Sequence, residues 1–274
     1  MKAAVDKPVV LLTNDDGFDS PLMLAWAEEL RDMYTPVIVA PVHEMSWASA
    51  RHVVTRPVRV RRQDRRDLTV YRVTGSPVDC VHLAIQHLGI KPALVFSGPN
   101  FGLNAGAIRI VFSGTVQAAL AATRLGVPSV ALSIYYPRTV RQQHSRVKDL
   151  KPALYRNELA ACMELVRMFH RQRILHTGCL NINLPYPSSD PSKARMVRVH
   201  QDSNIDLFDR VGPMRFRAKP AYPDFDGVPA DTDMGAVSRG LIAVSSLAVQ
   251  FDDMRCNSER KPQGVRRRRA ASRV

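Results

Sequence analysis

The sequence has few cysteines, few aromatic residues and no long uninterrupted apolar run. Its 4 cysteines in 274 residues are widely scattered, and without a CxxC pair they give no support for structural zinc or a redox dithiol. Every long apolar run meets a charged, proline or polar residue before it could cross a bilayer. The opening MKAAVDKPVV does not have the basic-then-apolar layout of a signal peptide. We therefore expect buried free thiols, no membrane partner and a cytoplasmic protein.

The charge of the chain is concentrated in two segments. In total, 39 Lys and Arg against 25 Asp and Glu give a net charge of +14. Segment 254–274 holds eight Lys or Arg and one Glu, and segment 56–66 holds six arginines and one aspartate. Segment 254–274 has few large apolar residues, so we expect a disordered basic tail. Two interpretations of it remain open: a contact with RNA, DNA or another polyanion, and a solvated terminus.

Short apolar runs alternate with helix-like stretches in the first half of the chain, a pattern typical of a parallel sheet covered by helices. The expected strands are 7–13, 36–40, 53–60, 68–73, 93–96 and 129–134, and the expected helices are 21–34, 79–88 and 115–125. Farther along we expect a long helix at 154–171 and strands at 179–184 and 241–249. The intervening 185–231 is rich in Pro, Asp and Arg, with little periodicity. The pattern predicts an α/β core over about 7–184 and an irregular C-terminal extension over about 185–253.

Ligand sites of open α/β sheets lie where loops follow the carboxyl ends of strands. The first such loop is Thr13–Gly17, with the sequence TNDDG. Asp15 and Asp16 can converge on one cation at a strand-to-helix turn, and Gly17 permits the sharp turn. The alternative is that one of them caps a helix or forms an Asx turn. Because the Asp-Ser-Pro sequence at 19–21 supplies a more conventional cap, we favour a site for Mg, Mn or Ca.

Two further strand-end loops contain candidate ligands. Loop 40–49, APVHEMSWAS, offers Ser46 and Ser49 to a cation or a phosphate, and its His-Glu pair could act as acid or base; the alternative is a polar surface loop. Loop 96–106, FSGPNFGLNAG, has glycines that let backbone approach a ligand closely. In the same loop, Asn100 offers a neutral oxygen to a hard cation.

A fourth loop, 112–116 with the sequence FSGTV, leads into an Ala-rich helix. Ser113, Gly114 and Thr115 stand where the unpaired N–H groups of a helix start form an anion site, although SGT is also a common helix cap. A hard-cation loop together with a phosphate-ready helix N-terminus predicts metal-assisted phosphoryl chemistry. Segment 74–81, TGSPVDCV, matches an ordinary helix cap, which we favour over a catalytic role.

Five motifs, LLTNDDG, APxxxxS, TGSPVDCV, LVFSGPN and FSGTVQAA, occur in the order and approximate spacing of the survival protein E (SurE) family. The chain resembles this family well over about 8–134 and more faintly over 232–240. The resemblance implies a Rossmann-like α/β fold, mostly a parallel sheet with helices on both faces. It also implies a metal-dependent nucleotidase or acid phosphatase acting on nucleoside monophosphates, in some members on short polyphosphate, and a homodimer or homotetramer.

The site residues of the family carry over to this sequence one by one. The resemblance implies that one divalent cation per subunit is bound by Asp15, Asp16, Ser46 and Asn100. It places the phosphate near Ser113, Gly114 and Thr115, and Asn14 and Asn100 join the substrate-binding set. Under this assignment 1–253 is a phosphatase domain followed by the basic tail.

The sequence departs from the family pattern at two places that border the expected pocket. The family commonly has a polar stretch before SGT, where segment 107–111 (AIRIV) is apolar and one residue longer. The usual Ser-Gly after the APxxxxS position is Ser46-Trp47 here. Both departures bear on substrate preference and on efficiency.

These observations predict a divalent-metal-dependent phosphomonoesterase that hydrolyses nucleoside 5′- or 3′-monophosphates. Asp15 and Asp16 are the candidate catalytic carboxylates, one of which would orient or deprotonate the attacking water; a covalent aspartyl-phosphate remains an alternative. The rival hypothesis is a polyanion- or RNA-binding protein with a weakened phosphatase site, in which 56–66 and the tail provide the affinity. A Rossmann-type dinucleotide enzyme is disfavoured because no GxGxxG follows the first strand.

Overall fold

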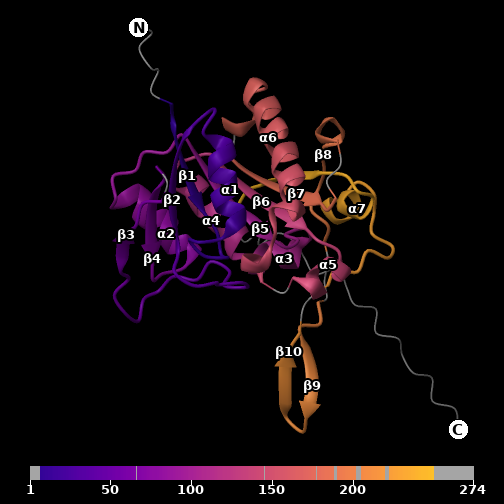
Figure 1. The fold of residues 1–274 in the computed structure, drawn as a ribbon. Coiled ribbons are helices and arrows are strands. Elements are labelled where there is room, and N and C mark those ends of the chain that lie inside the picture. Colours follow the sequence, from indigo (N-terminus) through magenta and orange to yellow (C-terminus); the bar gives the residue numbers. More distant parts are fainter. Residues whose placement is uncertain are drawn as a thin grey trace, which may run out of the picture.

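A mostly parallel sheet forms the centre of the molecule (Figure 1). The computed structural model describes residues 7–249 except 66, 145, 177, 188–189, 202–204 and 220–221. Within this part, nine strands lie in the order β3-β4-β2-β1-β5-β6-β7-β11-β8. Their bounds are β1 Val9–Thr13, β2 Thr35–Pro41, β3 Val60–Arg62, β4 Thr69–Val73, β5 Leu94–Phe101, β6 Ser129–Tyr135, β7 Cys179–Pro185, β8 Arg195–Met196 and β11 Ala243–Leu247. Strands β3 and β11 run antiparallel to β4 and β7, and the other neighbours are parallel.

Helices cover both faces of the sheet, which confirms the predicted fold class. Side chains alternate between the faces of a strand, so Val10 and Leu12 join the apolar cluster of α1 and α6, whereas Leu11 joins that of α2 and α4. The helices are α1 Pro21–Leu30, α2 Pro77–Gln86, α3 Ala107–Phe112, α4 Gly114–Arg124, α5 Arg138–Gln143, α6 Arg156–Arg171 and α7 Asp233–Ser238. Short 3₁₀ turns occupy Val147–Asp149, Pro152–Leu154, Ile174–His176 and Pro191–Lys193.

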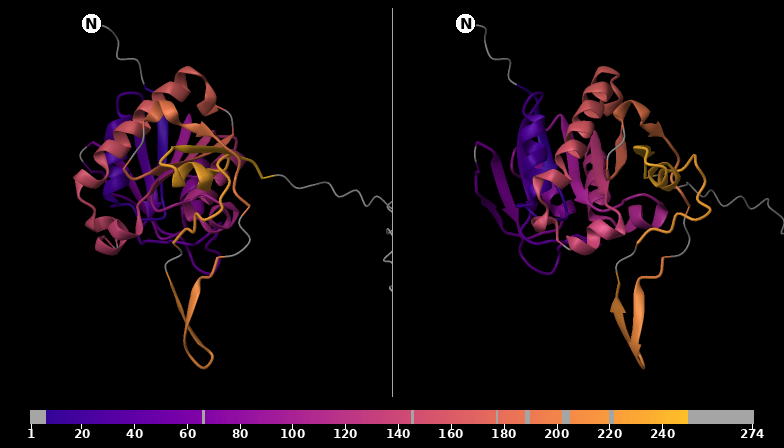
Figure 2. Two further views of the ribbon diagram at one scale, coloured as in Figure 1. Left: turned by 90° about the vertical axis from the view of Figure 1, so that its right-hand side faces the viewer. Right: turned by 45° about the vertical axis from the view of Figure 1, so that its right-hand side comes forward.

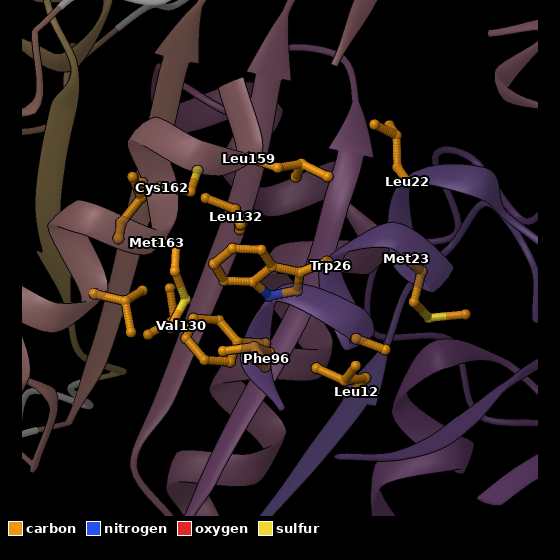
Figure 3. Packing of buried hydrophobic residues seen from close by; sticks show 14 of the residues in the cluster. Leu12, Leu22, Met23, Trp26, Phe96, Val130, Leu132, Leu159, Cys162 and Met163 are labelled. Atoms are coloured by element: carbon orange, nitrogen blue, oxygen red, sulfur yellow. The ribbon is translucent and has the colours of Figure 1, made fainter. Parts of the chain in front are cut away.

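Trp26 of α1 is the largest fully buried side chain of the core. Its ring meets the edge of Phe96 on β5, with the ring centroids 5.4 Å apart. Figure 3 shows it surrounded by residues of β5, β6 and α6, among them Leu132 and Leu159. Emptying such a site costs about 3–5 kcal/mol, so this residue joins α1 and α6 to the sheet that supports the strand-end loops.

The strand predicted at 53–60 is wrong. Residues 51–59 form no strand, and β3 begins only at Val60. Pro57 interrupts the alternation, and the flanking residues bond to the end of β4 instead: Arg56 donates to the Thr74 carbonyl, and the Arg59 N–H donates to the Thr74 hydroxyl. Residues 51–59 therefore form a largely exposed loop that leads into β3.

The N-cap of α1 lies where the sequence predicts it, but its side chain does not make the expected capping hydrogen bond. Ser20 is the N-cap residue and Pro21 follows it, yet the Ser20 side chain makes no capping bond. The neighbouring Asp19 instead pairs with Lys148 at 3.0 Å. The helix start is thus fixed by the proline and by packing rather than by a side-chain cap.

The C-terminal extension contains more regular structure than its sequence suggests. Strands β9 (Phe208–Gly212) and β10 (Arg215–Ala218) form an antiparallel hairpin that projects from the body of the molecule in all three views (Figures 1 and 2). The strand predicted at 241–249 is confirmed as β11. The predicted tail, 254–274, lies outside the described residues, and the domain boundaries stay predictions.

Three cysteines are buried and free, as predicted. Cys80, Cys162 and Cys179 form no disulfide, and burial raises the pKa of each thiol. Cys256 lies outside the described residues. These thiols act as small apolar core residues.

Candidate active site

The site lies at the topological switch point of the sheet. From β1 the chain continues to β2 on one side, whereas β5 pairs with the opposite side of β1 and leads on to β6. The loops that follow β1 and β5 diverge at this point and leave a crevice at the carboxyl ends of the strands. Asp15 and Asp16 follow β1, and Asn100 lies near the end of β5. The fold therefore brings together residues that are about 85 positions apart in the chain.

A cavity of about 150 Å³ opens at this crevice. Four of the predicted site residues line it: Asp15, Ser46, Asn100 and Ser113. The other predicted residues lie next to it, as described below, rather than on its wall. Further lining residues are Trp47, Phe101, Arg109, Phe112, Tyr135, Tyr136, Arg141 and Tyr222.

Asp15 and Asp16 form a buried carboxylate pair, 4% and 5% exposed. The Thr115 hydroxyl donates to Asp15 Oδ1 at 2.6 Å, and the Phe101 N–H donates a long bond of 3.4 Å to Asp16 Oδ2. Burial raises the pKa of Asp15, although the Thr115 hydroxyl and the backbone N–H groups of Asp15 and Thr115 oppose the rise. Burial and the neighbouring Asp15 carboxylate raise the pKa of Asp16 well above its usual value. Two desolvated negative charges side by side create a strong demand for a cation.

The turn after β1 is built by Asn14 and Gly17. Asn14 Oδ1 accepts the Gly17 N–H at 3.1 Å, and Gly17 has a φ of 105°, which only glycine adopts without strain. Asn14 is fully buried, and its Nδ2 has no hydrogen-bond partner among the described residues. This amide therefore supports the turn and retains one free donor beside the carboxylates.

The start of α4 both caps a helix and fixes Asp15. Ser113 is the N-cap, and its Oγ accepts the Val116 N–H at 3.1 Å. A Cβ added at Gly114 would lie 3.2 Å from Asp15 Cβ, so a larger residue would press on the carboxylate. The two interpretations of SGT are thus compatible, because the capping geometry itself brings Thr115 and Gly114 against Asp15.

Ser46 stands on the loop opposite α4. It is exposed, and its Oγ donates to Glu44 Oε1 at 2.8 Å. The Met45 N–H donates to the Asp15 carbonyl at 2.7 Å, which holds this loop against the first one. A carboxylate pair, a serine hydroxyl and an amide thus face the same crevice from three loops.

Sequence reasoning missed two cations of the site, Arg109 and Arg141. Arg109 of α3 is 7% exposed and lines the cavity. Arg141 of α5 donates to the Phe101 carbonyl, and its guanidinium lies 4.2 Å from the Phe101 ring centroid. Burial lowers the pKa of Arg141, and the nearby Asp16 opposes that shift. A single arginine within the apolar run AIRIV was the one available signal. Two cations beside a carboxylate pair suit an anionic substrate.

The residues of the crevice fit a hard divalent cation. Within the described part of the chain, no three His, Cys, Asp or Glu side chains gather into a metal site. A cation would therefore depend on the two carboxylates together with the oxygens of Ser46 and Asn100. An all-oxygen set of this kind suits Mg²⁺, Mn²⁺ or Ca²⁺.

The other two conspicuous motifs have structural roles. Ser76 and Asp79 form a reciprocal capping box at α2, and Asp79 also contacts His52, so the favoured capping interpretation agrees with the geometry. Asp233 of the fainter motif at 232–240 accepts the N–H groups of Gly106, His200 and Met234 at 2.8–3.0 Å. It thereby ties the C-terminal extension to the loop after β5.

The fold and this crevice define a Rossmann-like α/β protein whose acidic pair lies at the switch point of the sheet. The chain belongs to the SurE family: the model described as "Survival protein SurE" matches residues 10–205. This membership confirms the predicted family and the prediction of an enzyme, a hydrolase. None of the described helices has the length and apolar character needed to span a membrane.

Relatives from bacteria and archaea match almost the whole chain. A protein named 5'-nucleotidase SurE from Citrifermentans bemidjiense is 31% identical over 249 residues, which cover 88% of this chain and 93% of that protein. Proteins of the same name from Caulobacter vibrioides and Halobacterium salinarum are 33% and 34% identical, with coverage of 88% of this chain and 90% and 92% of theirs. The crystal structure of the SurE protein from Aquifex aeolicus has a TM-score of 0.68 and 26% identity, covering 90% of this chain and 95% of that one.

Proposed function

We propose that the chain is a divalent-metal-dependent phosphomonoesterase that hydrolyses nucleoside monophosphates, with the phosphate at the 5′ position as in the names of its relatives. The observation that carries the proposal is the buried Asp15–Asp16 pair beside a cavity that is also lined by Arg109 and Arg141. An acidic pair alone would repel a phosphate, and arginines alone would bind one without hydrolysis. Their combination suits a metal-bridged phosphoryl site.

Each residue of the crevice has a role in the proposed reaction. Asp15, Asp16, Ser46 and Asn100 would hold the cation, and a bound cation would supply polarisation of the phosphate and a lower pKa of bound water. Thr115 fixes the orientation of the Asp15 carboxylate through its 2.6 Å bond.

Asp15 and Asp16 are the candidate carboxylates to orient or deprotonate the attacking water. Arg109 and Arg141 neutralise the phosphate and stabilise the charge that develops on it. Ser113 and Thr115 lie at the helix start nearest the phosphate.

The test is a phosphate-release panel. Purified protein is incubated with AMP, 3′-AMP, short polyphosphate and p-nitrophenyl phosphate, first in EDTA and then with Mn²⁺, Mg²⁺ or Ca²⁺ restored. We expect turnover only with a cation and highest turnover with AMP. Full activity in EDTA would overturn the metal assignment, and inactivity toward every substrate with each cation would overturn the function.

We also propose that the chain forms a homodimer or homotetramer. Phe208, Val211, Met214 and Phe216 of the β9–β10 hairpin are exposed apolar residues, and a projecting element with several such residues is typical of a surface that another chain covers. Light scattering at several concentrations tests this proposal, and a monomer at every concentration would refute it.

The rival hypothesis of a polyanion-binding protein depends on 56–66 and on the tail. Arg56 and Arg59 are bonded to the end of β4, and Arg62 pairs with Asp64 at 2.8 Å. The tail lies outside the described residues, so its role stays a prediction. RNA affinity that falls steeply with salt and is lost on truncation after Asp253 would support this rival.

A further inference from the structure

Two exposed aromatic side chains stand together at the rim of the cavity. Trp47 and Phe112 both line it and are 47% and 39% exposed. Their ring centroids lie 6.0 Å apart with the planes tilted by 43°. The two rings therefore lie beside each other at the rim, and both stay partly exposed to solvent.

The backbone at Trp47 adopts a conformation that disfavours a bulky residue. Its φ is 61°, in the left-handed region where a large side chain is strained by about 1 kcal/mol or more. Such strain persists where the surroundings hold it, and it clusters at ligand sites. At the rim of a cavity, a large aromatic residue held in this conformation favours a role in ligand binding.

The surroundings do hold the two rings in place. The Ser49 N–H donates to the Phe112 carbonyl at 3.0 Å, and Ser49 Oγ donates to the Val111 carbonyl at 2.7 Å. At its other end the loop is bonded to the Asp15 carbonyl through Met45. The two places where the sequence departs from the family pattern, Trp47 and the segment before Ser113, are therefore joined into one rigid wall.

The size of the cavity indicates which part of a bound nucleotide would contact Trp47 and Phe112. At about 150 Å³ it is smaller than the roughly 300–1,000 Å³ of pockets that enclose a whole ligand. With the phosphate at Asp15 and Ser113, the far end of a nucleotide must extend to the rim. That far end is a flat aromatic base, which stacks well on indole and phenyl rings.

We propose that Trp47 and Phe112 form the stacking surface for the nucleobase and so determine the specificity of the enzyme for nucleotides over other phosphomonoesters. This inference rests on the proposed function and names the part of the substrate that the rim selects. Trp47 supplies the larger ring, and Phe112 fixes its tilt.

The first experiment compares kcat/KM for AMP and for ribose 5-phosphate, which lacks the base. The variants are Trp47→Gly, Trp47→Phe and Phe112→Ala. Stacking of one base is worth about 5- to 150-fold, so Trp47→Gly is expected to lower the ratio of the two constants by about tenfold or more. Trp47→Phe is expected to retain most of it. Effects on the neighbouring Ser46 alter both substrates equally and cancel in the ratio.

A matched control variant separates stacking from relief of strain. Arg173 has a φ of 58° and is exposed at the end of α6, far along the chain from the cavity loops. Arg173→Gly relieves the same backbone strain without removing a ring, and we expect its ratio to equal that of the unmodified enzyme. Because glycine suits both positions, Trp47→Gly is expected to fold with an unchanged or higher Tm.

Tryptophan fluorescence gives a readout that needs no turnover. The chain has 2 tryptophans, and Trp26 is fully buried, so quenching by a ligand at the rim reports on Trp47. Adenosine, which has no phosphate, is expected to quench the emission in EDTA, and this quenching should disappear in Trp47→Phe. Quenching without phosphatase activity toward any substrate would support the inference while refuting the proposed function. Activity with an unchanged substrate ratio in Trp47→Gly and no quenching would overturn the inference and leave the function standing.

Discussion

Two pairs of buried carboxylates in this molecule have opposite surroundings. Asp79 and Asp233 are surrounded by donors: the N–H groups of Ser76 and Val53 and the His52 ring contact Asp79, and three backbone N–H groups contact Asp233. Asp15 accepts a 2.6 Å bond from the Thr115 hydroxyl and interacts with the backbone N–H groups of Asp15 and Thr115, whereas the Phe101 N–H donates only a long bond of 3.4 Å to Asp16.

This difference in hydrogen-bond partners distinguishes carboxylates that stabilise the fold from carboxylates that can bind a ligand. A carboxylate whose oxygens are occupied by backbone N–H groups joins segments, and its oxygens are not available to a ligand. Even with three N–H groups, burial raises the pKa of Asp233. For Asp16, burial is opposed by a single hydrogen bond from a backbone N–H among the described residues and is reinforced by the neighbouring Asp15 carboxylate, so this pair has an unmet demand for a positively charged ligand.

The largest expected effect is on activity at the acidic pair. Asp15→Asn or Asp16→Asn is expected to lower phosphate release by at least about a hundredfold, because the loss of a charged ligand reduces cation binding and water activation. Steady-state kinetics at saturating Mn²⁺ checks this. Near-native activity of the variant with both Asp15→Asn and Asp16→Asn would show that the active site does not lie in this crevice.

The same substitution is expected to stabilise the protein when no metal is bound. Because the pKa of Asp16 is raised in the folded state, its ionisation opposes folding at neutral pH, and this cost disappears as the pH falls through the folded-state pKa. In EDTA, urea unfolding should show Asp16→Asn more stable than the unmodified chain at pH 7–8, with a smaller difference at lower pH. A difference that grows on acidification would contradict the assignment.

A large effect on stability is expected at Asp233. Asp233→Ala leaves the N–H groups of Gly106, His200 and Met234 without their acceptor, at a cost of about 3 kcal/mol. Denaturant unfolding measures this loss. The comparison of the two pairs would fail if Asp233→Ala abolished activity while leaving the unfolding midpoint unchanged.

Thr115→Val tests the single strong bond to Asp15. A lost donor to a charged oxygen costs roughly 1.5–3 kcal/mol, so kcat/KM is expected to fall about ten- to a hundredfold while the fold is preserved. The pKa of Asp15 should rise further, because the Thr115 hydroxyl opposes its elevation, and the acid limb of the pH–rate profile should move to higher pH. Unchanged kinetics together with a lower Tm would show that Thr115 only stabilises the start of α4 and has no role in catalysis.

The smallest effect is expected at the capping box of α2. Ser76→Ala removes the acceptor of the Asp79 N–H at 3.1 Å and should cost about 1 kcal/mol of stability. Activity toward AMP should remain within about twofold. Thermal unfolding and the phosphatase assay on the same sample show whether the capping box of Ser76 and Asp79 has only a structural role.

Sequence alone predicted the parts of the site that follow strands. Asp15 and Asn100 were found because parallel strands end at one edge of the sheet, so that local motifs become neighbours. Ser113 was found from the SGT pattern of a helix start, although it follows α3 and not a strand. Arg109 and Arg141 were missed because they reach the cavity from α3 and α5, two short helices whose docking depends on tertiary packing. The β9–β10 hairpin was missed for a related reason: its exposed strands lack the one-sided burial that creates a readable alternation.

Hydrogen exchange at the projecting hairpin can report whether another surface covers it. All four residues of β10 are exposed, as are four of the five in β9. A lone two-stranded ribbon is marginally stable in water, so its amide hydrogens open to solvent at almost no free-energy cost and exchange with deuterium far sooner than those of β1 or β6. Slow exchange confined to 208–218 would therefore register another surface lying over the hairpin, residue by residue and at the protein concentration of the measurement.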